Sequence, residues 1–276
     1  MKPVARALAD ATRQLSETSD TPRLDAELLM AEALHIDGDR LILNPPDRDP
    51  PKRFYTMVKR RLKGEPIAYI TGRRAFWNIE LHVGPGVLIP RPDSEVLITA
   101  ALEHFEGGTG PRRILDLGTG PGTLLLAALD LWPEATGVGI DSSRRALSYA
   151  SANARRLGFD TRAKFRTGNW ADGIDERFDL VLCNPPYVRA DEVLDPGVAG
   201  HEPEEALFAG PEGLDSIRQV APQIPRLLEP GGLAAVEIGA DQGEEARSLL
   251  ERDGLGARVV PDLAGRDRAV LLTWVK

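Results

Sequence analysis

The chain has 276 residues, 42% hydrophobic and 28% charged, which is the composition of a soluble globular protein with mass for two domains. No apolar run approaches the ~20 residues of a membrane-spanning helix, and a net charge of −8 argues against a surface devoted to nucleic acid. The start of the chain lacks a signal-peptide core, Cys183 has no disulfide partner, and the four histidines lack metal-ligand spacing. We therefore expect a cytoplasmic protein without a disulfide, a metal or membrane contact.

The first seventy or so residues carry three apolar stripes with helical spacing. The stripes consist of Leu8, Ala11 and Leu15; Leu24, Leu28 and Leu29; and Phe54, Val58 and Leu62. Thr21-Pro22 predicts the start of the second helix, and Asp49-Pro50 and Gly64 predict the two ends of the third. We predict a small helical domain over residues 1–72.

Residues 73–90 change from helical to alternating spacing. Trp77, Ile79, Leu81 and Val83 are apolar at every second position, and the Gly/Pro-rich stretch 84–86 leads into VLIP. This pattern predicts a β-hairpin that turns at residues 84–86 and links the helical domain to the rest of the chain.

Strand and helix patterns alternate through residues 91–276. The strand patterns cover residues 112–118, 135–141, 163–169, 178–184, 233–239 and 268–276, and the helical patterns cover residues 91–105, 123–132, 142–158, 214–228 and 242–250. This alternation predicts a mainly parallel sheet with helices on both faces. Such sheets bind ligands at the carboxyl ends of their strands, where Asp116, Asp141, Asn184 and Glu237 fall.

The stretch LDLGTGPG places Gly118, Gly120 and Gly122 in the turn between a strand and a helix. Glycine allows positive φ and a close backbone approach to a ligand, although many such turns contain glycine for steric reasons alone. The dehydrogenase fingerprint G-x-G-x-x-G fails because its last position is Thr123. The spacing G-x-G-x-G is instead that of S-adenosylmethionine enzymes.

Asp141 ends the next strand pattern, 25 residues after Asp116. S-adenosylmethionine contains a ribose, and a carboxylate at this position can accept hydrogen bonds from both of its hydroxyls. The alternative is that Asp141 is the N-cap of the helix that begins with SSRRAL. The glycine loop upstream favours ribose binding.

Asn184, Pro185, Pro186 and Tyr187 follow the apolar strand LVLC. The prolines end the ladder because they lack an N–H, so an edge strand that runs into a rigid turn is the structural alternative. A planar NH₂ group is a poor nucleophile, and two fixed acceptors on its hydrogens would align it for methylation. The Asn184 side-chain oxygen and the Pro185 carbonyl suit this task, and the Tyr187 ring can lie against a planar substrate.

The whole chain resembles the HemK-type protein-glutamine N5-methyltransferases. The resemblance lies in the stretches LDLGTGPG, GNW, NPPY, HEPEEALFAGPEGLD, VEIGADQG and GEPIAYITGRRAFWNIELHVGPGVLIPRPDSE. It implies a Rossmann-like class I methyltransferase domain over residues 91–276, with a seven-stranded sheet, behind a helical-bundle domain and a hairpin. It also implies methyl transfer from S-adenosylmethionine to N5 of the glutamine in the Gly-Gly-Gln motif of bacterial peptide chain release factors, which modulates translation termination.

By position, the resemblance implies two sets of site residues. Those around the cofactor are Gly118, Thr119, Gly120, Pro121, Gly122, Asp141, Trp170 and Asn184. The glutamine would be held by residues 184–187, with Asn184, Pro185 and Tyr187 as the catalytic set. Trp170 would lie by the adenine, and its alternative is a core tryptophan. Pro121 departs from the serine that is common in the family and removes one backbone donor.

From Lys52 to Arg74 there are eight basic residues and one acid, Glu65, a local charge of +7 that leaves −15 for the remainder. A solvated helix face is the plain interpretation. The functional interpretation is that residues 1–72 form a substrate-docking domain, because one glutamine side chain offers too little surface to select a protein. We expect a monomeric enzyme that binds release factors and makes no direct contact with nucleic acid.

Two other functions compete with this one. An adenine-N6 nucleic-acid methyltransferase shares the NPPY chemistry, but it must also grip its nucleic acid and, in a duplex, flip out a base, and the net charge of −8 argues against this. A non-catalytic binding module could keep the cofactor fold, but the intact acceptors of NPPY argue against it.

Overall fold

The computed structural model describes residues 2–195 and 197–275, which form two compact units. The first unit contains residues 2–73 together with residues 194, 195 and 197–201. The second unit contains residues 74–193 and 202–275. The division into residues 1–72, 73–90 and 91–276 that we inferred from the sequence stays a prediction.

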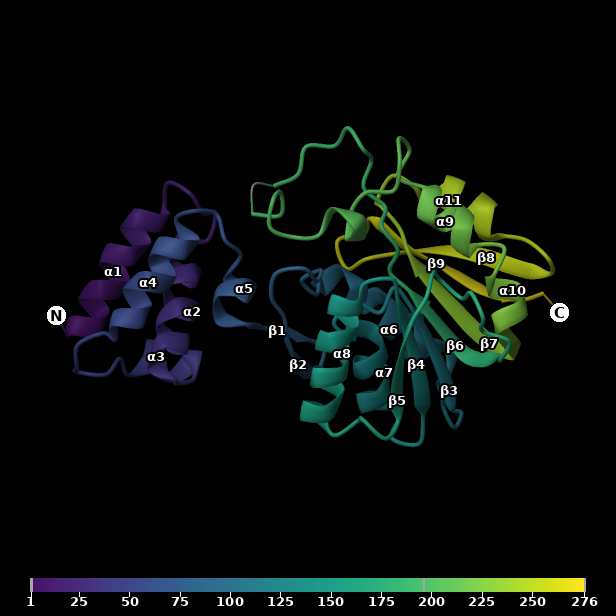
Figure 1. Ribbon diagram of the computed structural model, residues 1–276, viewed down its shortest axis with the longest axis horizontal. Coiled ribbons are helices and arrows are strands. Elements are labelled where there is room, and N and C mark those ends of the chain that lie inside the picture. The colour runs from purple at the N-terminus through teal and green to yellow at the C-terminus, as the bar shows by residue number, and fades with distance from the viewer. Residues whose placement is uncertain (1, 196, 276) are drawn as a thin grey trace. The chain divides into compact units, whose positions relative to one another are not determined.

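The first unit is a bundle of short helices around α2 (Figure 1). Its helices are α1 (Pro3–Leu15), α2 (Pro22–Leu34), α3 (Gly38–Leu43), α4 (Lys52–Arg61) and α5 (Ile67–Thr71). Helix α2 packs against the other four helices. Its buried side chains include Ala26, Leu29 and Met30, which join Phe54 of α4 in one core.

Two details of the predicted bundle are wrong. Leu24 and Leu28 are exposed, because the buried face of α2 is set by Ala26, Leu29, Met30 and Ala33. Helix α4 begins at Lys52 after an extended Pro51, and not at Asp49-Pro50. A residue that precedes a proline is biased away from helical geometry, so the consecutive prolines delay the helix.

The hairpin also differs from the prediction. Its strands are β1 (Arg73–Phe76) and β2 (Ile79–His82), so the turn lies at Trp77, which has a φ of 53°, and not at residues 84–86. The segment of residues 83–90 forms no strand. It contains Pro85 and Pro90, which cannot donate to a ladder, and Ile89 is held instead by a hydrogen bond to Glu202.

The second unit contains a seven-stranded sheet in the order β5-β4-β3-β6-β7-β9-β8. The strands are β3 (Arg113–Leu117), β4 (Thr136–Asp141), β5 (Ala163–Thr167), β6 (Phe178–Cys183), β7 (Leu228–Glu237), β8 (Leu255–Pro261) and β9 (Asp267–Trp274). The first five strands of this order are parallel, and β9 runs antiparallel to both of its neighbours. The predicted fold class is confirmed.

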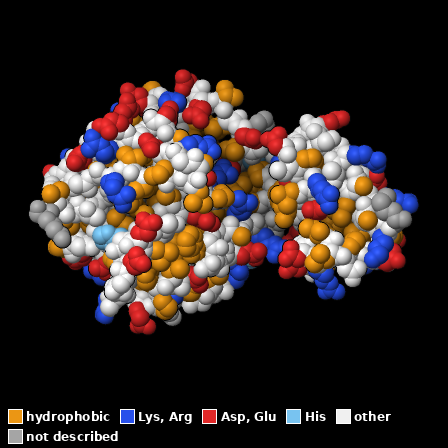
Figure 2. Space-filling view, turned by 180° about the vertical axis from the view of Figure 1, so that it is seen from behind, with side chains coloured by type: hydrophobic (Ala, Val, Ile, Leu, Met, Phe, Trp, Pro, Cys, Tyr) orange, Lys and Arg blue, Asp and Glu red, His pale blue; other side chains and the backbone are white. Residues whose placement is uncertain are grey.

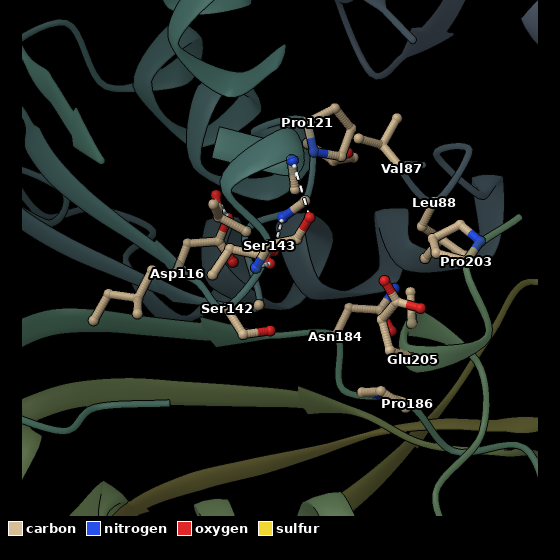
Figure 3. A pocket seen from close by; sticks show the side chains of 18 of the residues that line it. Val87, Leu88, Asp116, Pro121, Ser142, Ser143, Asn184, Pro186, Pro203 and Glu205 are labelled. Atoms are coloured by element: carbon tan, nitrogen blue, oxygen red, sulfur yellow. Dashed lines mark hydrogen bonds between the residues drawn. The ribbon is translucent and has the colours of Figure 1, made fainter. Parts of the chain in front are cut away.

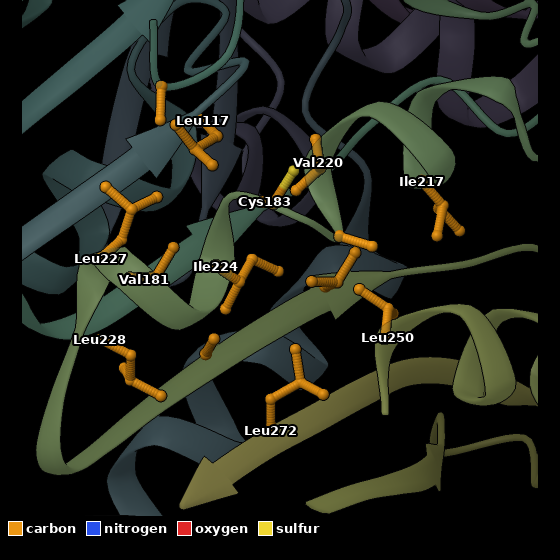
Figure 4. Close-up of a cluster of buried hydrophobic side chains, with 14 of the residues drawn as sticks. Leu117, Val181, Cys183, Ile217, Val220, Ile224, Leu227, Leu228, Leu250 and Leu272 are labelled. Atoms are coloured by element: carbon orange, nitrogen blue, oxygen red, sulfur yellow. The ribbon is translucent and has the colours of Figure 1, made fainter. Parts of the chain in front are cut away.

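Helices cover both faces of this sheet (Figure 1). One face carries α6 (Glu95–His104), α7 (Thr123–Leu131) and α8 (Arg144–Leu157), and the other carries α9 (Asp215–Val220), α10 (Ile224–Leu227) and α11 (Gly243–Leu250). Under the second group lies a core of aliphatic side chains that includes Val181, Ile217, Ile224 and Leu250 (Figure 4). Cys183 is buried in the same core, where it packs as a small apolar side chain.

Two elements of the second unit were predicted incorrectly. The helix predicted over residues 214–228 is divided into α9 and α10, because Pro222 and Pro225 cannot continue a helix interior. Strand β8 has no counterpart in the prediction, since glycine, alanine and arginine interrupt its apolar pattern.

The described helices are all too short or too polar to cross a membrane. Acidic and basic side chains both appear on the face of each unit shown in Figure 2, with hydrophobic side chains between them.

Candidate active site

A pocket with a volume of about 280 Å³ lies at the carboxyl ends of β3, β4 and β6. Asp116, Asp141 and Asn184 come from these three strand ends and all line it. Strand β3 pairs with β4 on one side and β6 on the other, so the strand order changes direction here, as it does at the ligand sites of open α/β sheets. The structure therefore brings three of the four predicted polar residues to one cavity, whereas Glu237 at the end of β7 does not line it.

The glycine loop forms one wall of the pocket between β3 and α7. Gly118 and Gly120 have φ values of 71° and 57°, a conformation that side chains rarely adopt. A Cβ on Gly122 would lie 2.8 Å from Leu126, whereas a Cβ on Gly120 would meet nothing within 4 Å. Gly122 is thus required by packing with α7, and Gly120 leaves open space for a ligand. The carbonyl of Pro121 accepts a hydrogen bond from buried Asn153 at 2.9 Å, which holds the loop in place.

Asp116 lies under this loop and is almost fully buried. Its Oδ2 accepts hydrogen bonds from Thr119 Oγ1 at 2.6 Å and from the amide of Leu125 at 3.2 Å. Its Oδ1 has no partner among the described residues. Burial raises the pKa of Asp116 from 3.8 to about 7, and the hydrogen bonds oppose this shift only in part. A buried carboxylate with one free oxygen is suited to a ligand that donates a hydrogen bond or carries positive charge.

The stability of the ligand-free protein should depend on the protonation of Asp116. The folded protein keeps this proton up to about pH 7, whereas the unfolded chain releases it near pH 3.8. Stability is therefore expected to fall as pH rises between these values. Asp116→Asn should show a smaller loss of Tm between pH 4.5 and 7 than the wild type, measured by thermal unfolding. Equal losses in the two proteins would contradict the raised pKa.

Asp141 connects the glycine loop to the start of α8. Its Oδ2 accepts from the amide of Gly120 at 2.9 Å, and its Oδ1 accepts from the amide of Ser143 at 2.8 Å. The N-cap of α8 is Ser143, whose Oγ accepts from the amide of Ala146, so the N-cap alternative for Asp141 is wrong. Burial raises the pKa of Asp141. Each carboxylate oxygen keeps further lone pairs toward the pocket that the residue lines.

Trp170 lines the pocket and also packs against the core beside β6. Its indole Nε1 donates to Gln219 Oε1 at 2.9 Å, and the amide of Ala171 donates to Gln223 Oε1 at 3.1 Å. Two glutamines near α9 therefore hold the loop that carries Trp170. Trp170 is half-buried between the pocket and the core, and its position beside the adenine stays a prediction.

Asn184 and Pro186 line the pocket, whereas Pro185 and Tyr187 do not. Figure 3 shows Asn184 and Pro186 on the side of the pocket near Glu205, away from Asp116 and Ser142. The Nδ2 of Asn184 donates to Ser94 Oγ at 2.9 Å. Its Oδ1 accepts no hydrogen bond from the residues that the structure describes and remains a free acceptor. Pro185 is buried directly behind Asn184.

Tyr187 is anchored through its backbone, and its phenol is largely buried. Its carbonyl accepts a hydrogen bond from Gln242 Nε2 at 3.0 Å, and Gln242 also bonds to the carbonyl of Gly213 at 3.2 Å. The pKa of the phenol is raised by burial and by the nearby charge of Glu237. The turn after β6 is therefore rigid, as the two prolines predict.

Several residues of the site could not be identified from the sequence alone. Glu202 accepts from the amide of Ile89 at 2.8 Å and from Arg91 Nη2 at 2.5 Å, so the stretch HEPEEAL is joined to LIPRPDSE. Arg91, Ser94 and Glu205 line the pocket without having been predicted to do so. In the sequence, both stretches are among those that resemble the family, but this resemblance does not show that they contact each other.

The pocket fits S-adenosylmethionine on three counts. Its loop has space above Gly120, and Asp141 offers lone pairs for a ribose. The site also has an indole for stacking, from Trp170.

Comparison with known families assigns both parts of the chain. Residues 6–72 match the family described as "PrmC N-terminal domain", and residues 111–251 match the family described as "Methyltransferase domain". Among solved structures, "T. Thermophilus 16S rRNA N2 G1207 methyltransferase" has a TM-score of 0.53 at 20% identity, over 74% of this chain and 50% of that one. A methyltransferase from Pyrococcus furiosus has a TM-score of 0.52 at 18% identity, over 78% and 96%. These structures support the fold.

Curated relatives match nearly the whole chain. The protein named "Release factor glutamine methyltransferase" in Cereibacter sphaeroides is 42% identical over 274 residues, which covers 96% of each chain. The proteins of the same name in Caulobacter vibrioides and Moorella thermoacetica are 41% and 37% identical, over 91% and 96% of this chain and 89% and 96% of theirs. These relatives cover most of the chain at about 40% identity, and the pocket lies at the switch point of a methyltransferase sheet. This chain therefore belongs to the release factor glutamine methyltransferase family.

Proposed function

We propose that this S-adenosylmethionine-dependent methyltransferase modifies N5 of the glutamine in the Gly-Gly-Gln motif of bacterial peptide chain release factors and so modulates translation termination. The observation that carries the proposal is the free Oδ1 of Asn184, which lines the same pocket as the glycine loop. The relatives named for this activity support the substrate class. In this proposal the enzyme is a cytoplasmic monomer that does not bind nucleic acid directly.

The cofactor would be held by residues 118–122, Asp141 and Trp170, with Asp116 beneath them. When bound, S-adenosylmethionine supplies an electrophilic methyl group. The chain's own residues then have to prepare a weak nucleophile, because the lone pair of an amide nitrogen is delocalised into its carbonyl. Asn184 Oδ1 and the Pro185 carbonyl would accept the two amide hydrogens and fix the tilt of the group. The Tyr187 ring would limit its sideways movement and help to exclude water.

The adenine-N6 alternative uses the same acceptors and differs in the substrate that reaches them. The ion pairs Arg61–Asp25, Arg60–Glu65 and Arg73–Glu32 reduce the positive charge that residues 52–74 can offer to a phosphate backbone. Incubation with radiolabelled S-adenosylmethionine, a release factor and duplex DNA tests both functions at once. Label in the protein and not in the DNA is expected, and label only in the DNA would overturn the proposal.

Docking of the release factor is assigned, as part of this proposal, to the exposed lysines of α4. Arg61 is unsuited to this role, because its side chain is only 16% exposed and its Nε lies 2.7 Å from Asp25 Oδ2. Lys52, Lys59 and Lys63 are exposed and have the spacing of a single helical stripe that continues past the end of α4. These side chains can meet an acidic surface without breaking an internal ion pair.

Charge reversal of this stripe (K52E/K59E/K63E) should raise KM for the release factor by about 10-fold at low salt, since exposed charges act mostly on encounter. The affinity for the cofactor, measured by calorimetry, should not change. The control is R6E/R40E/R48E, which reverses three exposed arginines of the same unit and has the same net charge. Equal KM changes in both variants would show a general charge effect and contradict docking by α4.

A further inference from the structure

Glu237 is a fully buried carboxylate whose role is not explained by the fold. It ends β7, and the register pairs Val236 with Cys183, so Glu237 lies beside the strand end that leads into Asn184. Burial of a carboxylate is costly unless it is hydrogen-bonded or paired. The hydroxyls of Ser94 and Tyr187 interact with it and lower its pKa, although neither contact meets strict hydrogen-bond geometry. Both are residues next to the acceptor of the proposed reaction.

Ser94 links Glu237 to Asn184. A serine hydroxyl has one hydrogen to donate, and Ser94 Oγ already accepts from Asn184 Nδ2. The Ser94 hydroxyl is one of the two that lower the pKa of Glu237. An ionised carboxylate can only accept, so the Ser94 hydrogen is left for Glu237 and not for Asn184. Ser94 can then offer Asn184 nothing but lone pairs, and the amide must turn its NH₂ toward Ser94 and its oxygen toward the pocket.

Other charged groups also face Glu237. Arg268 of β9 is attracted to it, but its Nη2 also lies 3.3 Å from Asp93 Oδ2 and 3.6 Å from Asp262 Oδ2. Burial of Glu237 and the negative charge of Asp93 both oppose ionisation of Glu237. The guanidinium of Arg268 is shared among Glu237, Asp93 and Asp262. It therefore stabilises the charge of Glu237 only in part, and the hydroxyls of Ser94 and Tyr187 supply the rest of the stabilisation.

We propose that Glu237 and Ser94 are positioning residues: Glu237 orients the Ser94 hydroxyl, and this hydroxyl fixes the Asn184 amide with Oδ1 toward the substrate. The inference rests on the proposed role of Asn184. It explains why a buried acid, Glu237, stands at the end of β7 and why the stretch LIPRPDSE contains the hydroxyl of Ser94. It also explains how an amide side chain, which could rotate by 180°, keeps one orientation.

The arrangement has a pH dependence. Burial raises the pKa of Glu237 to about 7, and the hydroxyls and Arg268 oppose this shift. Once protonated, Glu237 can donate to Ser94, and the Ser94 hydrogen becomes free to bond to Asn184 Oδ1. The amide then loses its fixed orientation, so kcat should fall as pH drops below about 7.

The first test compares two substitutions at Ser94. Ser94→Ala should lower kcat by about 10- to 100-fold, the range expected when a reacting group is misplaced, with cofactor affinity within about twofold. Ser94→Thr keeps the hydroxyl and should retain most of the wild-type kcat. In the Asn184→Ala background, Ser94→Ala should cause no further loss, because Ser94 acts through Asn184. Full kcat in folded Ser94→Ala, or an additive loss in the double variant, would overturn the proposal.

The second test observes Asn184 directly. In the cofactor-free protein labelled with ¹⁵N, the side-chain amide signal of Asn184, identified by its loss in Asn184→Ala, should shift with pH near 7. In Glu237→Gln, which keeps the shape of the side chain, this shift should be absent. Both proteins carry Asp116→Asn, because Asp116 lines the same pocket and its pKa is also raised to about 7. A shift that persists in Glu237→Gln would overturn the link. This readout is independent of the proposed function, which would fail instead if Asn184→Ala kept normal turnover.

Discussion

Asn184→Ala is expected to lower turnover by about 10²–10³, as the loss of a preorganised polar group does, while cofactor affinity stays within a few-fold. Asn184 Oδ1 is the acceptor that the structure leaves free in the pocket, and its Nδ2 is fixed by Ser94 at 2.9 Å. Alanine would remove the acceptor and leave the hydroxyl of Ser94 without its donor. Single-turnover methylation of a release factor, together with calorimetry of the cofactor, separates the two quantities.

Asn184→Asp is the matched comparison for this prediction. It keeps an acceptor but loses the NH₂ group that donates to Ser94, and it places a negative charge near buried Glu237. We expect this variant to be impaired as well, because its charge could pair with the sulfonium and misplace the site. Near-normal turnover in Asn184→Ala would contradict the mechanism proposed above.

Asp141→Ala is expected to weaken cofactor binding by about 1.5–3 kcal/mol, the range for hydrogen bonds to a charged group. The carboxylate lines the pocket and also accepts from the amide of Gly120 at 2.9 Å. The variant therefore loses a ribose acceptor and frees the glycine loop. Calorimetry with S-adenosylmethionine measures the change directly.

Asp37→Ala is the control for this prediction, because Asp37 is the N-cap of α3 in the first unit and does not line the pocket. Its loss should lower stability by about 1 kcal/mol and leave cofactor affinity close to that of the wild type. If a folded Asp141→Ala protein bound the cofactor with unchanged affinity, the ribose role would be wrong.

The class of the fold and the location of the site follow from patterns along the chain. Apolar strand patterns that alternate with helical ones require a covered parallel sheet, and side chains at the carboxyl ends of its strands must share one edge. Asp116, Asp141 and Asn184 could therefore be placed together before any coordinates were known. The glycine spacing and the prolines of NPPY are local constraints on φ, so they too can be read from the chain.

The hydrogen-bond and ion-pair partners of these residues become visible in the folded chain and not before. Asn184 and Ser94 are 90 residues apart, and Arg91 and Glu202 are 111 apart, so no periodicity links them. The same limit explains Arg61, which counted as a free positive charge in the sequence until its pairing with Asp25 placed it inside the helical unit. Local patterns report the preferences of neighbouring residues, whereas burial, side-chain orientation and pKa depend on groups that only folding brings together.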